Sequence, residues 1–193
     1  IVRVDGTNEL DYESASTCTV TVTSTSDDGS TSTADFTITL TDFDEFDVST
    51  PSDTDSDSNS VSENVTNGAS AEITASASDS DGTNNGVTYG IASQTCTGAF
   101  TIAGSTGIVT VSDTSAIDYE TATTCYVVVR ATSADGSTAD TNFSISVTDA
   151  DEFDVGSVSD TDSDANTLAE DVSNGASAEI TASATDADGS TNT

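Results

Sequence analysis

Residues 67–77 read NGASAEITASA, and residues 174–184 repeat the same letters. Within the first copy, Ala71, Ile73 and Ala75 alternate with polar residues. A period of two places these apolar side chains on one face of a β-strand. The stretch therefore predicts a strand with one buried face, and its second copy predicts a repeated domain.

Two more segments recur at the same spacing, which is 174 minus 67, or 107 residues. TDFDEFDV at 41–48 returns as TDADEFDV at 148–155, and DYE at 11–13 returns at 118–120. We expect a linear tandem array whose units contact only their neighbours, and a chain that is a window of a longer array. The expected division is residues 1–47, the C-terminal half of a repeat with its linker; residues 48–154, a complete repeat with its linker; and residues 155–193, the N-terminal half of the next repeat.

Strand signals dominate each repeat. Val87, Tyr89 and Ile91 alternate with polar neighbours, and turn pairs such as Asp135-Gly136 separate the apolar runs. No stretch combines a helical period with helix caps. About seven short strands in roughly 100 residues, with a turn every 8–12 residues, are typical of an immunoglobulin-like sandwich. We therefore predict an all-β fold of tandem Greek-key sandwiches.

One strand indicates which side chains face the core, because in the first repeat its apolar residues alternate with Thr19, Thr21 and Thr23. We expect the apolar members to point inward and the threonines to face water. The inward residues predicted in this way are Cys18, Val20 and Val22 in the first repeat and Cys125, Val127 and Val129 in the second.

The charge of the chain limits its partners. Thirty-five Asp and Glu stand against two Lys and Arg, for a net charge of −33. Nucleic acid and anionic membrane surfaces are excluded as electrostatic partners, because no basic patch can meet phosphate. No segment is long and apolar enough to span a membrane. Hard cations such as calcium, which prefer oxygen ligands, are the natural partners of so many carboxylates. A solvated acidic surface is the alternative interpretation.

The three cysteines also follow the repeat. Cys18 and Cys125 occupy the same position in successive repeats, whereas the position of Cys96 occurs once in the chain. A disulfide within one repeat, Cys96 to Cys125, is the simplest interpretation, and Cys18 would then pair upstream of the sequence. The alternative is that all three are reduced thiols in the core. A disulfide would indicate an oxidising, extracellular compartment.

Four acidic motifs span one repeat and resemble those of the cadherin family in its bacterial form. The residues that carry the resemblance are Ser62-Glu63-Asn64, Asp79-Ser80-Asp81-Gly82, Asp118-Tyr119-Glu120 and Asp149-Ala150-Asp151-Glu152. The third motif has Tyr where the family has Arg, and the linker lacks the usual Asn and Pro.

The resemblance implies calcium ions at the junctions between consecutive repeats. Calcium takes six to eight oxygen ligands, and a divalent ion would turn the repulsion of crowded carboxylates into a rigid joint. At the first junction the implied ligands are Asp11, Glu13, Asp42, Asp44, Glu45, Asp79 and Asp81. At the second junction they are Glu63, Asp118, Glu120, Asp149, Asp151, Glu152, Asp186 and Asp188.

A second acidic run is a weaker metal candidate. It opens like a calcium loop, with aspartates at alternate positions, but it lacks the glycine and the final glutamate of that loop. A solvated strand entry is the alternative. The residues are Asp53, Asp55 and Asp57, repeated as Asp160, Asp162 and Asp164.

These patterns favour a mechanical role over catalysis. Histidine is absent, and an acidic site duplicated at every domain boundary is not typical of an enzyme. We expect a calcium-rigidified repeat of a secreted or cell-surface, bacterial adhesin that acts as a stiff spacer in cell adhesion or biofilm. A self-assembling extracellular filament, in which like chains associate, is the first alternative. A sandwich that binds carbohydrate or a surface partner is the second, although aromatic residues make up only 5% of the chain.

Overall fold

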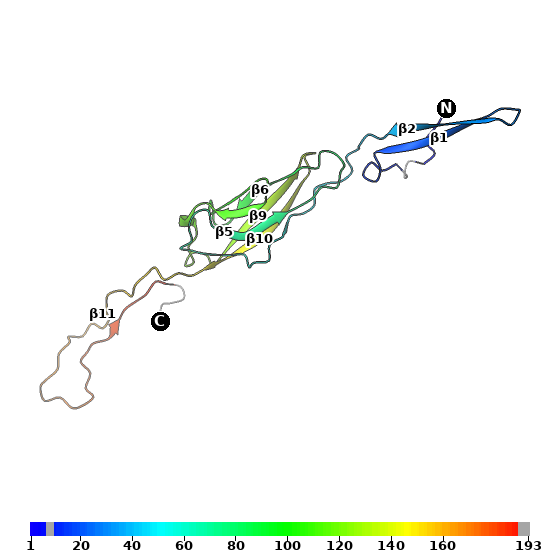
Figure 1. Ribbon diagram of the computed structural model, residues 1–193. Helices are drawn as coiled ribbons and strands as arrows, with labels where there is room; N and C mark the ends of the chain where they lie inside the picture. Colours follow the sequence, from blue (N-terminus) through cyan, green and yellow to red (C-terminus); the bar gives the residue numbers. More distant parts are fainter. Residues whose placement is uncertain (7–9, 189–193) are drawn as a thin grey trace.

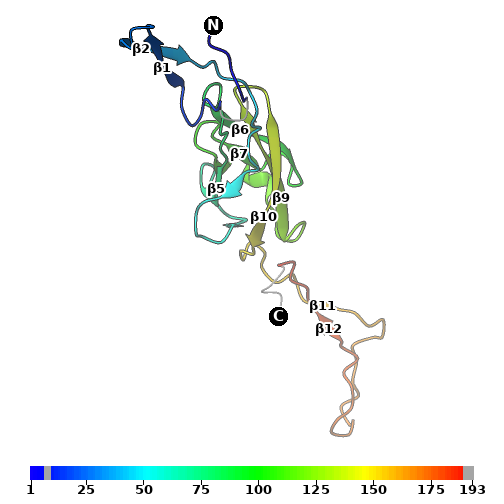
Figure 2. The ribbon, with the colours of Figure 1, turned by 90° about the vertical axis from the view of Figure 1, so that its right-hand side faces the viewer.

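The computed structural model describes residues 1–6 and 10–188. Figure 1 shows three β units that follow one another along an elongated molecule, and the view in Figure 2 agrees. A sandwich lies between an N-terminal hairpin and a short C-terminal strand pair. The hairpin consists of β1 (Thr17–Thr25) and β2 (Thr31–Thr39), and the C-terminal pair of β11 (Ser159–Asp160) and β12 (Ala182–Ser183). The described residues include no helix with the length and apolarity that a membrane span requires.

The central sandwich consists of two four-stranded sheets. The order of the first is β4 (Ser60–Ser62), β10 (Thr138–Thr148), β9 (Thr124–Ser133) and β6 (Val87–Gln94). The order of the second is β3 (Ser52–Asp53), β5 (Ser70–Ser76), β8 (Ile108–Val111) and β7 (Phe100–Ile102), and a short 3₁₀ turn, η2 (Thr114–Ala116), precedes β9. The chain crosses repeatedly between the sheets, so that β5 pairs with β8 and β10 pairs in parallel with β4. This is the predicted all-β, immunoglobulin-like Greek-key topology.

The core of the sandwich lies between the two sheets. Cys125, Val127 and Val129 on β9 are fully buried, which confirms the inward face predicted for this strand. They pack with Ile73 on β5 and Val109 on β8 from the opposite sheet. Alternating side chains of the two sheets therefore build one core, as the period of two requires.

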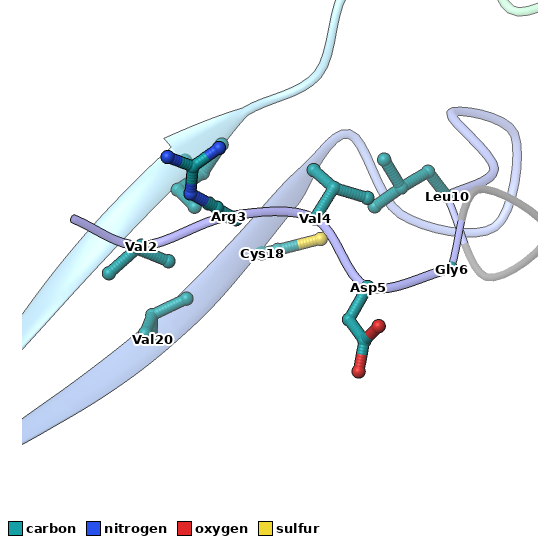
Figure 3. Close-up of a pocket in the computed structure, with 9 residues that line it drawn as sticks. Val2, Arg3, Val4, Asp5, Gly6, Leu10, Cys18 and Val20 are labelled. Atoms are coloured by element: carbon teal, nitrogen blue, oxygen red, sulfur yellow. The ribbon is translucent and has the colours of Figure 1, made fainter.

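The N-terminal hairpin has the same alternation but not the same burial. Val22 is 40% exposed and Cys18 is half-buried, so the prediction that this face is covered is wrong for the hairpin. In the described residues, β1 and β2 pair only with each other, and no second sheet lies over them. Figure 3 shows the N-terminal segment with Val2 and Val4 lying beside Cys18 instead, around a shallow apolar pocket.

One glycine is essential to the turn before β8. Gly107 has a φ of +71°, and a Cβ placed there would lie 2.0 Å from the carbonyl oxygen of Ala75. Glycine tolerates both the positive φ and the close approach of backbone. The Gly-Ser-Thr-Gly sequence that ends at this residue therefore brings β8 against β5.

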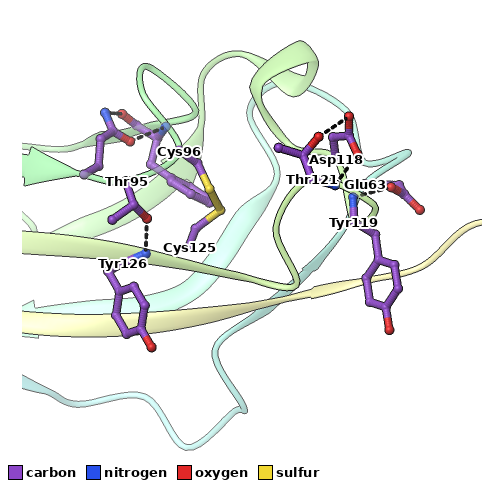
Figure 4. The surroundings of a disulfide bond; sticks show 10 residues. Glu63, Thr95, Cys96, Asp118, Tyr119, Thr121, Cys125 and Tyr126 are labelled. Carbon is purple, nitrogen blue, oxygen red and sulfur yellow. Dashed lines mark hydrogen bonds between the residues drawn. A yellow bond between two sulfur atoms is a disulfide. The ribbon is translucent and has the colours of Figure 1, made fainter. Parts of the chain in front are cut away.

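Cys96 and Cys125 form the disulfide expected within the repeat, with Cα atoms 5.5 Å apart. Figure 4 shows it joining the segment after β6 to the start of β9. Cys125 is itself a core residue, so the bridge ties a surface loop to the interior. Cys18 remains a free thiol in the described chain.

Candidate metal-binding junctions

Three segments meet at the first junction, between the hairpin and the sandwich. Glu13 comes from the turn before β1, Asp42 from the linker after β2, and Asp81 from the loop after β5. One carboxylate oxygen of each lies within 4.8 Å of the others. The backbone N–H of Gly82 donates to Oε1 of Glu13 at 2.8 Å. This junction therefore gathers acidic groups that lie up to about 70 residues apart in the sequence.

Asp81 also holds the linker in place. Its 2% exposed side chain accepts hydrogen bonds from the backbone N–H groups of Glu45, at 3.2 Å, and Phe46, at 3.3 Å. The same carboxylate belongs to a second group with Asp44 and Asp135, again within 4.8 Å. Asp81 therefore joins two candidate metal positions through one buried side chain.

Asp135 was not among the candidate ligands that the sequence indicated. It lies in the tight turn between β9 and β10, where Asp135-Gly136 was interpreted only as a turn signal. Its partners Asp44 and Asp81 are distant in the sequence, so only the fold brings them together. The recurrence of the same dipeptide as Asp28-Gly29 was the one signal available.

The second junction is organised by Glu63, which is 8% exposed. Oε2 of Glu63 accepts from the N–H of Tyr119 at 2.6 Å, drawn in Figure 4, and Oε1 accepts from the N–H of Ala150 at 2.6 Å. Two acidic groups share this side chain, with ligand atoms again within 4.8 Å of one another. They are Glu63 with Asp118 and Glu120, and Glu63 with Asp149 and Glu152.

The two junctions repeat one local design. Asp188, 1% exposed, accepts from the N–H groups of Glu152, at 3.1 Å, and Phe153, at 3.3 Å. Asp81 makes the corresponding bonds 107 residues earlier. Within each junction a buried aspartate of the downstream unit therefore accepts hydrogen bonds from the backbone of the linker that follows the upstream unit.

The remaining predicted ligands lie at the same two junctions but mainly make local hydrogen bonds. Asp11 accepts from the N–H and hydroxyl of Ser14, at 3.0 and 2.8 Å. Asp79 and Asp186 each accept from the N–H two residues later, at 3.1 and 3.2 Å. Six of the predicted ligands belong to none of the metal-capable groups in the described residues: Asp11, Glu45, Asp79, Asp151, Asp186 and Asp188. The full ligand set stays a prediction.

The weaker acidic run has a different local role. Oδ1 of Asp53 accepts from the N–H of Thr74 at 3.0 Å and from that of Asp55 at 3.3 Å. Asp160 makes the matching bond to Thr181 at 2.9 Å. Among the described residues, neither run forms a metal-capable group. These side chains fasten the strand entry to the neighbouring strand, and an extra ion here stays a prediction.

A direct contact also crosses the first junction. A Cβ at Gly82 would lie 2.5 Å from the ring of Tyr12, so only glycine lets this ring approach. Across the same junction, the hydroxyl of Thr83 donates to Asp42. Tyr12 occupies the middle of the Asp-Tyr-Glu motif, where the family pattern has Arg. The ring therefore contributes packing at a position where a cation is usual.

Within the described residues, no salt bridge to Arg is found at either junction. The only salt bridge in the described residues is Arg130–Asp140, on the exposed surface of the sandwich. Asp42, Asp79 and Asp188 each have one buried carboxylate oxygen that accepts no hydrogen bond from the described chain. Burying a charged oxygen without a partner is costly. A hard cation with several oxygen ligands fits these residues, and calcium is the ion whose coordination they suit.

The pKa directions agree with crowding of like charges. Loss of solvent at the junction, followed by repulsion from neighbouring carboxylates, raises the pKa of Asp44 and of Glu45. Repulsion from Asp188 raises the pKa of Asp151, and loss of solvent followed by repulsion from Glu63 raises the pKa of Glu152. Without a bound cation these four linker carboxylates therefore resist ionisation.

Comparisons with known proteins identify the fold of the central sandwich. Residues 57–148 match the family described as Cadherin domain, and the sandwich has the immunoglobulin-like cadherin fold. No curated protein sequence matches the chain.

Several solved structures are similar in fold. Protocadherin gamma B2 extracellular cadherin domains 1–5 superpose with a TM-score of 0.71 at 24% identity, over 93% of this chain and 34% of that one. Protocadherin gamma B7 extracellular cadherin domains 1–4 give 0.70 at 22% identity, over 93% and 42%. Mouse protocadherin-24 EC1–3 gives 0.68 at 22% identity, over 95% and 59%. The chain thus spans less than two thirds of each of these proteins, and the likeness establishes the fold.

Proposed function

We propose that this chain is a calcium-rigidified structural repeat of an extracellular adhesin, in which bound ions stiffen successive sandwiches into a spacer. One observation carries the proposal. At each junction, carboxylates from separate segments converge, and the described residues form no salt bridge there. Some of the carboxylate oxygens are also buried without a hydrogen-bond partner in the described chain. The carboxylates of such a joint repel one another until a divalent ion binds between them.

The residues that would hold the ions follow from the groups described above. At the first junction they are Glu13, Asp42, Asp44, Asp81 and Asp135. At the second they are Glu63, Asp118, Glu120, Asp149 and Glu152. The ion would supply positive charge that two units and their linker share. Because it would bind only the folded arrangement, it would raise the stability of the folded state by mass action.

The setting proposed for this role is the outside of a cell. Cadherin domains are extracellular adhesion modules without enzymatic activity, and the match over 57–148 supports the same for this chain. A disulfide is also typical of an oxidising compartment. A bacterial source, and a role in biofilm, remain part of the proposal. The solved structure described as the protocadherin gamma B7 EC3–6 cis-dimer favours, as a second candidate, an array whose like chains associate laterally into a filament.

Small-angle scattering of the 193-residue chain tests the rigid-spacer proposal. With calcium, we expect the pair-distance distribution of a single rigid rod, because bound ions fix the angle between units at both junctions. With chelator, we expect a broadened distribution, because repulsion between carboxylates loosens the joints.

Two controls separate calcium binding from general screening. Sodium chloride at matched ionic strength should restore little of the rod, because salt screens exposed charges but does not ligate buried oxygens. Magnesium should act weakly, because it demands a smaller and more regular oxygen shell. Identical scattering with calcium and with chelator would refute the proposal.

A further inference from the structure

One face of the sandwich carries no net charge although the chain as a whole carries −33. Along β6, β9 and β10 the only charged side chains are Arg130 and Asp140. They neutralise each other through two hydrogen bonds of 2.8 and 2.7 Å. The outer face of these three strands is therefore distinct from the acidic junctions at either end.

The same face also differs between repeats. Tyr126 and Val128 on β9 stand where the hairpin strand β1 has threonines, 107 residues earlier. Asn142 on β10 stands where β2 has an aspartate. The inward residues Cys125, Val127 and Val129 are unchanged between the two copies. The changes at Tyr126, Val128 and Asn142 therefore lie on the solvent side of the sheet, where a ligand could meet them.

A groove of about 500 Å³ lies on this face, and every residue that lines it is uncharged. They are Ser93, Gln94, Thr95, Tyr126, Val128 and Asn142. Tyr126 is 46% exposed, and Figure 4 shows its ring directed away from Cys125 on the opposite side of β9. The exposed side-chain amide of Asn142 makes no hydrogen bond within the part of the chain described. An aromatic ring and a free amide therefore border one shallow groove.

The walls of the groove are fixed in place. Thr95 and Tyr126 each adjoin a cysteine of the disulfide, and the N–H of Tyr126 donates to the hydroxyl of Thr95 at 2.9 Å. The amide of Gln94 binds both the N–H and the carbonyl of Phe100, at 3.0 and 3.2 Å. A site whose walls are already ordered loses little conformational entropy when a ligand binds.

We propose that this groove binds a neutral oligosaccharide. A sugar presents an apolar face and a rim of hydroxyls, which match the Tyr126 ring and the Asn142 amide respectively. A ligand without charge meets no repulsion on a face without net charge, whereas the surrounding carboxylates repel anionic sugars. Cations are drawn to the junctions instead, because the groove contains no carboxylate.

A second copy of this chain fits the face less well. Each copy carries −33, and lateral docking would bring the acidic junctions of two copies close together. A small neutral ligand brings no such charge. Self-association through this face is therefore an outcome that the experiment must be able to detect.

Nuclear magnetic resonance of the ¹⁵N-labelled 193-residue chain in calcium buffer tests the proposal. The probes are cellohexaose, chitohexaose and laminarihexaose at millimolar concentration. We expect saturable shifts of the backbone signals of Ser93, Thr95, Tyr126 and Asn142 with at least one sugar. The variant Tyr126→Thr with Asn142→Asp should bind that sugar about tenfold more weakly, because it loses the ring and gains a charge.

The variant carries the residues that the neighbouring copy has at these positions, so it is expected to fold. Ile108→Thr, an exposed change on the opposite sheet, is the matched control and should bind as the parent does. No shift at these residues with any of the three sugars would overturn the proposal. Shifts that depend on protein concentration without sugar would also overturn it, in favour of a second copy.

Discussion

The β1–β2 hairpin and the β9–β10 hairpin share most of the apolar residues of one face, 107 positions apart, but have different surroundings. Ile145 on β10 is fully buried, whereas Ile38 on β2 is 44% exposed. Phe143 packs against the core, whereas Phe36 is 56% exposed. Both hairpins nevertheless pair in the same antiparallel register. Alternation therefore specifies the strand pair, but burial depends on the opposite sheet.

The largest expected difference between the two hairpins concerns the cysteines. Replacing both Cys96 and Cys125 by alanine should lower the free energy of unfolding by about 3–4 kcal/mol, because a loop of this length is no longer closed in the unfolded chain. Cys18→Ala should change it little, because this thiol has no disulfide partner in the described residues. Denaturant unfolding of the three proteins gives the comparison. If the double variant lost no more stability than Cys18→Ala, the disulfide would not stabilise the sandwich.

The next difference concerns matched isoleucines. Ile145→Ala should cost about 2–4 kcal/mol, since it leaves a cavity between two packed sheets. Ile38→Ala should cost well under about 1 kcal/mol, since its side chain is already partly in water. Urea unfolding measures both values. A large loss for Ile38→Ala would mean that its face is covered in solution.

A smaller effect on stability is expected from acidification, and it compares calcium-free with calcium-loaded protein. The raised pKa values of Asp44, Glu45, Asp151 and Glu152 mean that the folded junctions hold protons more tightly than the unfolded chain does. Their contribution to stability is complete below the ordinary carboxyl pKa and is lost as pH rises through the raised pKa.

Dialysed, calcium-free protein should therefore melt at a higher temperature as the pH falls from neutral toward about 5. With calcium the sign should reverse, because protons compete with the ion for the same oxygens. Calorimetric melting curves in the two conditions measure this. Asp79 has a lowered pKa, due first to the nearby hydroxyl of Ser133, and this shift acts only below the ordinary carboxyl range. The same trend in both conditions would contradict the account.

The smallest expected effect concerns Arg130 and Asp140, which pair across β9 and β10. The hairpin has Thr23 opposite Thr33 at the matching register. Arg130→Thr with Asp140→Thr should leave the melting temperature nearly unchanged, because solvent screens an exposed ion pair. A substantial drop would show that the pair stabilises the sheet.

Much of the fold followed from the sequence because the repeat displayed its apolar positions twice. The inward face of β9 and the Cys96–Cys125 disulfide were predicted from that pattern. The short strands β3 and β4 were not, because two or three residues show no period. Ile108 was also not assigned to the outer face, because it precedes Val109 and both are apolar.

The acidic junctions were only partly accessible from sequence. Motifs indicated Glu13, Asp81 and Glu63, because they recur or resemble a family pattern. Asp135 was missed, since its partners come from other segments and only the fold assembles them. The Tyr126 groove was equally hidden, because composition counts aromatic residues without showing which of them are exposed.

The central claim is that the junction carboxylates bind calcium, and a calorimetric calcium titration of the 193-residue chain tests it most directly. Glu13→Gln and Glu120→Gln are matched variants, 107 residues apart, that each remove one ligand charge from a different junction. We predict saturable binding by the parent chain and a loss of affinity in each variant that is confined to one class of sites. Absence of binding heat, together with a melting temperature that calcium does not change, would contradict the claim.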